Sequence, residues 1–191
     1  MGAAFAELES GTHGLAFASG LAAIDSVLKT LKPGDEIIAG QDLYGGTARL
    51  FRANHAPMGL VFHFVDTQKP ELVEAAMNDR TKLVWLESPT NPLMQITDIA
   101  AIAALTNPRG ILLAVDNTFA SPMLQRPLEH GADIVMHSVT KYMGGHSDGV
   151  MGALITKDEN PRPETTKDTL SKLRPAFIKV IISSRRSQYF T

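Results

Sequence analysis

Short apolar runs alternate with amphipathic stretches through most of this 191-residue chain, and this rhythm limits the folds open to it. The apolar runs, which have the length of buried strands, lie at residues 14–18, 36–39, 61–65, 82–86, 111–115, 133–136 and 152–155. The stretches with helical spacing or helix-start signals lie at residues 21–31, 70–77 and 98–105. Strands that alternate with helices form a mostly parallel sheet, so we predict an α/β fold with seven strands.

The bulk properties are those of an ordinary globular protein, with 44% hydrophobic and 20% charged residues. A net charge of −2 gives no general attraction to nucleic acid or to an anionic membrane. No apolar run approaches the ~20 residues that span a bilayer, and residues 1–7 lack the basic start of a secretory signal. We therefore expect a cytoplasmic protein that binds neither nucleic acid nor membranes.

Several classes of site are excluded by missing motifs. The chain has no cysteine, which rules out disulfides, zinc ribbons and a cysteine nucleophile. Its six histidines show no metal-ligand spacing, so we predict no metal site and expect most of them on the surface or in loops. A hydrolase elbow, a dinucleotide-binding glycine motif and a phosphate-binding P-loop are also missing from the sequence.

Polar and glycine-rich residues gather where the predicted strands end. They are Ser19-Gly20 after residues 14–18, Glu87 after 82–86, Asp116 after 111–115, and the segment from Ser138 to Lys141 after 133–136. Parallel α/β sheets bind ligands at the carboxyl ends of their strands. We therefore expect a functional site at this edge of the sheet.

Three of the polar residues suit a cofactor with an aldehyde and a pyridine ring. Lys141 follows a strand and lies among hydroxyl residues, a good position for a Schiff-base lysine. Asp116 can face the ring nitrogen and keep it protonated. Tyr44 precedes two glycines on a loop and can offer its aromatic face to the ring.

A phosphate on the same cofactor would also find donors. Ser19, Gly20 and Leu21 place backbone N–H groups at a predicted helix N-terminus, a natural anion site. Ser138 and Thr140 can add hydroxyl groups. Each of these residues, taken alone, also has an ordinary explanation as a cap, a turn or an exposed side chain. Their order along the chain is what favours the cofactor.

Six blocks of sequence carry a resemblance to a known family. They are ASGLAA at 18–23, LKPGD at 31–35, DLYGGT at 42–47, ESPTNP at 87–92, VDNTF at 115–119 and HSVTKYMGGHSD at 137–148. Together they resemble the cystathionine γ-lyase / cystathionine γ-synthase family, the Cys/Met-metabolism group of fold-type I pyridoxal-phosphate enzymes. The similarity runs from about Ala4 to Lys157 and implies a three-layer sandwich that binds pyridoxal 5'-phosphate.

The resemblance also implies roles for individual residues. Lys141 would bind the cofactor and shuttle protons, while Asp116 would pair with the ring nitrogen. Tyr44 would stack on the ring and act near the substrate amine or leaving group. The remaining implied residues are Gly20, Leu21, Ser138 and Thr140 at the phosphate, Thr118 at the ring, Glu87 as an organiser of the site, and Arg49 and Asn91 near the substrate.

The implied reaction is the γ-elimination of cystathionine to cysteine, 2-oxobutyrate and ammonia. Residues 142–152 are closer to lyase members of the family, but a γ-synthase that joins cysteine to an activated homoserine stays open. A non-enzyme is the rival class, a truncated paralogue that keeps the sheet without turnover. The resemblance further implies a small amino-acid substrate and a homo-oligomer, a dimer or tetramer, whose subunits share the active site.

The two ends of the chain depart from the family pattern. We expect residues 1–156 to form the pyridoxal-phosphate-binding large domain, incomplete at its N-terminus because the family's Tyr-x-Arg arm is missing. Residues 157–191 do not resemble the family's C-terminal domain and are expected to be a linker or an atypical tail. We therefore expect a chain truncated at both ends.

Overall fold

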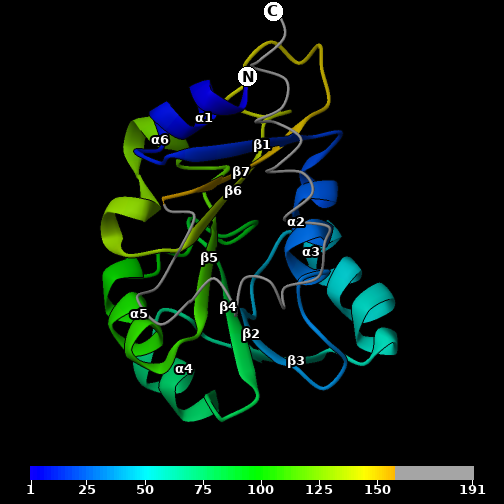
Figure 1. Ribbon diagram of the computed structural model, residues 1–191, viewed down its shortest axis with the longest axis vertical. Coiled ribbons are helices and arrows are strands. Elements are labelled where there is room, and N and C mark those ends of the chain that lie inside the picture. Colours follow the sequence, from blue (N-terminus) through cyan, green and yellow to red (C-terminus); the bar gives the residue numbers. More distant parts are fainter. Residues whose placement is uncertain (158–191) are drawn as a thin grey trace, which may run out of the picture. The chain divides into compact units, whose positions relative to one another are not determined.

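A single seven-stranded sheet forms the centre of the computed structural model, which describes residues 1–157 (Figure 1). Its strands are β1 (His13–Phe17), β2 (Glu36–Gly40), β3 (Val61–Val65), β4 (Thr81–Glu87), β5 (Leu112–Asp116), β6 (Ile134–Ser138) and β7 (Gly152–Thr156). They are ordered β1-β7-β6-β5-β4-β2-β3. Only β7 runs antiparallel to its neighbours, β1 and β6. The seven predicted strands and the mostly parallel sheet are confirmed.

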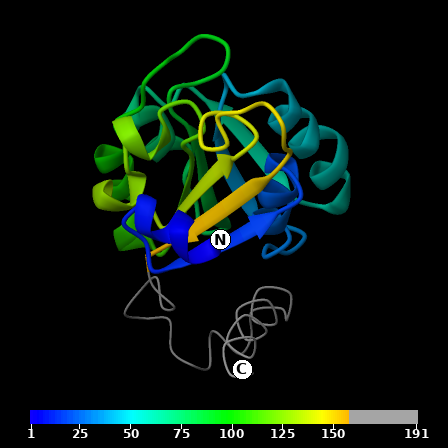
Figure 2. The same ribbon diagram turned by 90° about the horizontal axis from the view of Figure 1, so that it is seen from above.

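Helices cover both sides of this sheet (Figures 1 and 2). On one side lie α2 (Gly20–Leu28) and α3 (Gly45–Arg49), and on the other α4 (Pro70–Ala76), α5 (Ile99–Thr106) and α6 (Ser121–Leu124). Shorter helical segments are Leu50–His55, Ala56–Met58, Asn107–Arg109 and Pro127–His130. The predicted three-layer arrangement is confirmed.

The three helices expected from the sequence form where their start signals lie. Ser19 caps α2 by accepting a hydrogen bond from the Ala22 N–H at 3.1 Å. Asp98 caps α5 in the same way through the Ala101 N–H at 2.9 Å. Pro70 is the first residue of α4, where its missing N–H costs nothing. From the sequence, α2 was predicted by its apolar spacing, α4 by its proline start and α5 by its cap.

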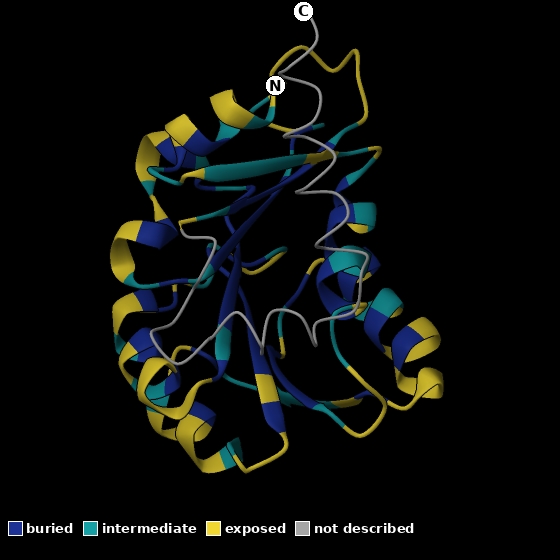
Figure 3. Ribbon diagram, in the orientation of Figure 1, coloured by how far each residue is buried: buried dark blue, intermediate teal, exposed yellow. Residues whose placement is uncertain are grey.

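The hydrophobic core is densest around the central strands (Figure 3). Five consecutive residues of β4, from Leu83 to Glu87, are buried, and so are Leu113 to Asp116 of β5. Such strands are covered on both faces, so they appear in sequence as continuous apolar runs rather than as alternating patterns. This burial fixes the position of the strand ends that carry the polar residues.

Three α-helices of the described residues were not predicted from the sequence: α3, α6 and the helix at the start of the chain. The first residues form α1 (Gly2–Leu8), which packs against β1 and β7. A close approach of two glycines permits this packing, because a Cβ on Gly14 would lie 2.2 Å from the Gly2 carbonyl oxygen. Seven residues are too few for a clear periodic pattern, and a helix this short is stabilised by tertiary contacts.

Two of the six histidines are exceptions to the expectation that most lie on the surface or in loops. His55 and His137 are buried, with 4% and 0% of their surface exposed. Both are hydrogen-bonded to a carboxylate, His55 to Asp25 and His137 to Glu9. A buried histidine needs such a partner, and the sequence does not show partners that lie far apart along the chain.

Within residues 1–157 no helix is long and apolar enough to cross a membrane. The same residues contain no group of His, Cys, Asp or Glu side chains that could hold a metal ion. The predicted tail at 157–191 lies outside the described residues except for Lys157, so the proposed domain division stays a prediction.

Candidate active site

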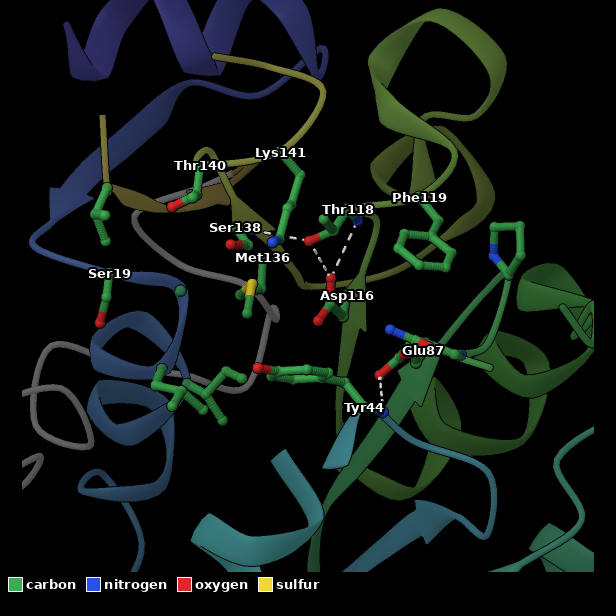
Figure 4. A pocket seen from close by; sticks show the side chains of 16 residues that line it. Ser19, Tyr44, Glu87, Asp116, Thr118, Phe119, Met136, Ser138, Thr140 and Lys141 are labelled. Atoms are coloured by element: carbon green, nitrogen blue, oxygen red, sulfur yellow. Dashed lines mark hydrogen bonds between the residues drawn. The ribbon is translucent and has the colours of Figure 1, made fainter. Parts of the chain in front are cut away.

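A pocket of about 410 Å³ opens at the carboxyl ends of β4, β5 and β6 (Figure 4). It brings together all the residues predicted to bind the cofactor, and one of the two predicted near the substrate. They are Ser19, Gly20, Leu21, Tyr44, Asn91, Asp116, Thr118, Ser138, Thr140 and Lys141. Their convergence follows from the parallel strands, whose ends meet at one edge of the sheet.

Asp116 is the last residue of β5 and is held by Thr118. The Thr118 N–H and hydroxyl donate to Asp116 Oδ1 at 3.0 and 2.6 Å. The same hydroxyl accepts the Ser138 N–H at 2.8 Å, which ties the ends of β5 and β6 together. Because both Thr118 bonds go to Oδ1, they orient the carboxylate without using Oδ2.

Two buried carboxyl groups lie side by side at this edge, since Glu87 and Asp116 are register partners on β4 and β5. The pKa of Glu87 is raised to about 8, mainly by burial and then by the negative charge of Asp116. The hydrogen bonds that Glu87 accepts from the backbone N–H groups of Tyr44 and Asn91 act in the other direction. Burial also raises the pKa of Asp116, although the Thr118 hydrogen bonds and the charge of His137 act in the other direction. The pair therefore favours a cation in the pocket.

Glu87 holds two segments of the pocket wall. Its Oε2 accepts the Tyr44 N–H at 3.0 Å, and its Oε1 accepts the Asn91 N–H at 2.8 Å. These contacts agree with the predicted role of Glu87 as an organiser of the site. Tyr44 is 49% exposed, and its side chain extends into the cavity opposite Lys141 (Figure 4).

The start of α2 forms one end of the pocket. Ser19 caps α2 by accepting the Ala22 N–H, and the first helical residues, Gly20 and Leu21, line the cavity together with Ser19. A Cβ on Gly20 would lie 2.9 Å from the Ser138 Cβ and 3.0 Å from its Oγ. Gly20 thus lets the helix N-terminus come up against Ser138, so that N–H groups and a hydroxyl face the same space.

Lys141 lies in the turn after β6, where its N–H donates to the Ser138 carbonyl at 3.0 Å. Its side chain points down into the cavity toward Ser138, Thr118 and Asp116 (Figure 4). An amine, a buried carboxylate, an aromatic side chain and an anion-binding helix start are the groups that pyridoxal phosphate requires. The donor set of this pocket therefore fits that cofactor.

Two of the predicted site residues, Arg49 and Thr140, have contacts that the sequence did not indicate. Arg49 ends α3, is exposed, and does not line the pocket, so its role near the substrate stays a prediction. The Thr140 hydroxyl already donates to the Met151 carbonyl at 3.2 Å and accepts the Met151 N–H at 3.0 Å. That hydroxyl joins the loop to the segment before β7 in addition to lining the cavity.

Apolar members of the pocket wall were not singled out from the sequence. They are Ile24, Pro89, Phe119, Met136 and Val150. Pro89 and Phe119 lie within sequence blocks that were recognised, so adjacency to the predicted residues was the available signal. Ile24, Met136 and Val150 are hydrophobic residues whose position beside a cavity depends on the fold.

Replacing Gly20 by alanine should weaken the binding of pyridoxal phosphate by about 5- to 150-fold. The added methyl group would overpack against Ser138, and overpacking typically costs ~1–3 kcal/mol. Titration of the apoprotein with the cofactor, followed by absorbance, measures this change. Gly45→Ala is the matched control, because nothing lies within 4 Å of a Cβ at that position. An unchanged dissociation constant for Gly20→Ala would contradict the close-approach argument.

Glu87 should make the stability of the apoprotein decrease as pH rises. Its pKa is about 8 in the folded state and 4.5 for the reference carboxyl, so the folded state binds more protons between these values. The free energy of unfolding should therefore fall from about pH 4.5 to about pH 8, by on the order of 3–5 kcal/mol. Urea unfolding at several pH values measures the slope.

Glu87→Gln should reduce this slope to the part that comes from Asp116, whose raised pKa acts in the same direction. Glu71→Gln, a change at an exposed glutamate of α4, serves as the control and should leave the slope as it is. A slope that persists in full in Glu87→Gln would assign the titration to another group.

Comparison with known proteins places the chain in one family of enzymes. The family model described as Cys/Met metabolism PLP-dependent enzyme matches residues 1–173. The cystathionine γ-synthase/O-acetylhomoserine (thiol)-lyase of Bacillus subtilis (strain 168) is 53% identical over 156 residues, 82% of this chain and 42% of that protein. The cystathionine γ-lyase of Dictyostelium discoideum is 51% identical over 154 residues, 81% of this chain and 40% of that protein.

A solved structure shows the same fold. The crystal structure of cystathionine γ-lyase from Lactobacillus plantarum complexed with L-serine matches with a TM-score of 0.81 and 52% identity. The match covers 82% of this chain and 41% of that chain, so this sequence spans less than half the length of the relatives it matches. At this level of identity the resemblance seen in the sequence is confirmed. The chain belongs to the family of Cys/Met-metabolism enzymes that depend on pyridoxal phosphate.

Proposed function

We propose that the protein containing this chain cleaves the γ carbon–sulfur bond of cystathionine. With one water consumed, the products are cysteine, 2-oxobutyrate and ammonia. The observation that carries this proposal is the convergence of Lys141, Asp116 and Tyr44 on one pocket beside an anion-binding helix start. Similarity to proteins named cystathionine γ-lyase supports the choice of an elimination reaction.

Each residue has a defined task in this proposal. Bound pyridoxal phosphate supplies an electron sink for the negative charge that proton removal leaves on a substrate carbon. Lys141 Nζ would hold the cofactor at its aldehyde and would move the proton of the substrate Cα. Asp116 would keep a positive charge at the ring nitrogen, and Tyr44 would pack against the ring.

The phosphate end is held by neutral donors. The N–H groups of Gly20 and Leu21 and the Ser138 hydroxyl bind the anion, with Ser19 as the cap and Thr140 nearby. The positive end of the α2 dipole faces the same anion. This arrangement anchors the cofactor at one end, while Lys141 and Asp116 fix its aldehyde and its ring.

The substrate and a second subunit complete the site. Asn91, positioned by Glu87, is proposed to face the amino-acid substrate, and Arg49 to lie near it. Tyr44 and Val150 line the pocket and are 49% and 69% exposed, and apolar side chains exposed at its rim support coverage of the pocket by another subunit. We propose a cytoplasmic homo-oligomer whose subunits share the active site.

A γ-synthase is the second candidate, because the Bacillus subtilis relative carries that name. Such an enzyme uses the same Lys141 and Asp116 but joins a cysteine thiol to the γ carbon of an activated homoserine. The two candidates differ in which sulfur compound is substrate and which is product. They are therefore separable by assay of one protein preparation.

The deciding experiment uses the full-length holoenzyme in two parallel reactions. Release of equal amounts of cysteine and 2-oxobutyrate from cystathionine alone supports the lyase. Formation of cystathionine from O-acetylhomoserine and cysteine, without cleavage of cystathionine, supports the synthase instead. If pyruvate is released in place of 2-oxobutyrate, the bond that is cleaved is the one between sulfur and the β carbon. A colourless protein that is inactive in both reactions would overturn both candidates in favour of an inactive paralogue.

A further inference from the structure

Two carboxylates join two loops that lie on the same side of the pocket. The first loop, residues 41–44 after β2, carries Tyr44, and the second, residues 88–97 after β4, carries Asn91. They are called the Tyr44 loop and the Asn91 loop below. Both of these side chains line the pocket. One of the joining carboxylates is Glu87, which also lines the pocket, and the other is Asp42, which does not.

Asp42 binds the Asn91 loop through a single oxygen. Its Oδ2 accepts the Leu93 N–H at 3.1 Å and the hydroxyl of Thr90, a residue that is 2% exposed. These two donors stand on either side of Asn91 in the sequence. Because Pro92 has no N–H, the Leu93 N–H is the first backbone donor after Asn91. Asp42 therefore brackets Asn91.

The Asn91 loop is also closed on itself by hydrogen bonds. The Thr90 N–H donates to the Gln95 carbonyl at 3.0 Å, and the Gln95 N–H donates to Thr90 Oγ1 at 2.9 Å. The Met94 N–H donates to the Thr90 carbonyl at 3.0 Å, and the Thr97 N–H to Ser88 Oγ at 3.1 Å. A loop closed in this way keeps its shape, so its place in the pocket depends on the groups that hold it from outside.

At residues 90–93 the groups that hold the loop from outside are Glu87 and Asp42. Glu87 Oε1 accepts the Asn91 N–H at 2.8 Å, and a single bond leaves the loop free to turn about it. The two bonds to Asp42, one before and one after Asn91, remove that freedom. The direction of the Asn91 side chain therefore depends on Asp42, although Asp42 itself does not line the pocket.

We propose that Asp42 is a positioning residue that, by binding Thr90 and Leu93 on both sides of Asn91, directs the Asn91 side chain toward the amino-acid substrate. This inference rests on the proposed place of Asn91 near the substrate. It adds a residue outside the pocket to those that determine how tightly the substrate binds. Asp42 acts through hydrogen bonds, so its charge is not required.

The charge of Asp42 offers the competing explanation. Burial and the charge of Asp116 are larger causes of the raised pKa of Glu87, and the charge of Asp42 adds to them. Two substitutions separate the explanations. Asp42→Ala removes both the acceptor and the charge. Asp42→Asn removes the charge alone, because one amide oxygen can take the place of Oδ2 and accept both bonds.

The test uses the full-length holoenzyme and two readouts. Asp42→Ala should raise the KM for cystathionine by about 2- to 12-fold, the effect of losing one hydrogen bond. The kcat and the cofactor dissociation constant should stay unchanged, because the contacts of Lys141, Asp116 and Tyr44 remain. The second readout is the dissociation constant of L-norvaline, an amino acid without a γ leaving group, measured by absorbance titration. It should rise by a similar factor whether the enzyme is a lyase or a synthase.

Asp42→Asn should restore both constants to those of the unchanged protein. If it binds substrate and norvaline as weakly as Asp42→Ala does, the charge of Asp42 is what matters, and the proposal is overturned. Asp79→Ala is the matched control, the loss of an exposed aspartate in the turn before β4. It should leave both constants as they are.

Asn91→Ala separates the two levels of the proposal. If it leaves both constants unchanged, the place of Asn91 near the substrate is wrong. If it raises them, the double variant Asp42→Ala/Asn91→Ala should bind norvaline as Asn91→Ala does, because the two residues act through one contact. Additive effects would show that only the role of Asp42 is wrong. A purely structural role would appear as a lower melting temperature and weaker cofactor binding with unchanged norvaline binding.

Thr90→Val keeps the test decisive if Asp42→Ala fails to fold. It removes the hydroxyl that donates to Asp42 and leaves the Leu93 N–H bond in place. The norvaline dissociation constant should therefore rise by a smaller factor than in Asn91→Ala. No change in Thr90→Val, beside a clear rise in Asn91→Ala, would overturn the proposal.

Discussion

Replacing Lys141 by alanine should abolish covalent capture of pyridoxal phosphate and lower turnover by at least roughly 10²–10⁴-fold, the range that proton transfer by one side chain supplies. The amine of Lys141 is the proposed anchor and proton carrier in this pocket. Because Lys141 is exposed on a turn, its loss should change the free energy of unfolding by no more than about 0.5 kcal/mol. Borohydride reduction followed by peptide mass mapping measures the capture directly.

The control for this experiment is Lys157→Ala, another exposed lysine that does not line the pocket. It should retain both the borohydride label and the activity. A label found on a peptide without Lys141 in the unchanged protein would overturn the assignment, whatever the effect of Lys141→Ala on turnover.

The fold was predictable because burial and local signals agreed. β4 and β5 are covered on both faces, so each contains an uninterrupted apolar run, Leu83–Leu86 in β4 and Leu112–Val115 in β5. α2 and α5 begin behind Ser19 and Asp98, whose side chains cap them. Strand and helix were therefore distinguishable from neighbouring residues alone, without knowledge of the order of the strands in the sheet.

The position of the site was predictable for a topological reason. In a parallel sheet the residues that follow each strand meet at one edge, so Asp116 and Lys141 could be expected in one pocket although 25 residues separate them. The antiparallel β7 could not be foreseen from its apolar sequence. Its pairing with β1 and β6 is a property of the chain path.

The rest depended on contacts between distant segments. Glu9 ends a short helix and has the sequence context of a surface residue, yet it is fully buried against His137, 128 positions away. Arg49 shows the opposite case, since it ends α3 close to Tyr44 in sequence but does not line the pocket. Neither result follows from spacing, because the direction of a side chain at a helix end depends on how the helix packs.

Replacing Asp116 by asparagine should lower turnover roughly 10- to 1000-fold, with a smaller change in cofactor content. Loss of an opposite charge near the ring shifts the proton affinity of its nitrogen by ~1–3 pH units, and each unit corresponds to about a tenfold effect. The asparagine oxygen can still accept the two hydrogen bonds from Thr118. Since the substitution also removes a buried charge, the apoprotein should keep its stability.

The same variant should also change the pH dependence of the stability of the apoprotein, because the negative charge of Asp116 helps to raise the pKa of Glu87. In Asp116→Asn that pKa should fall, and the pH range over which stability decreases should become narrower. Steady-state kinetics, cofactor absorbance and urea unfolding at several pH values measure the three effects. Asp79→Asn, the same change at an exposed aspartate, should produce none of them. Turnover close to that of the unchanged protein would mean that Asp116 only stabilises the turn after β5, since its hydrogen bonds with Thr118 would be its whole contribution.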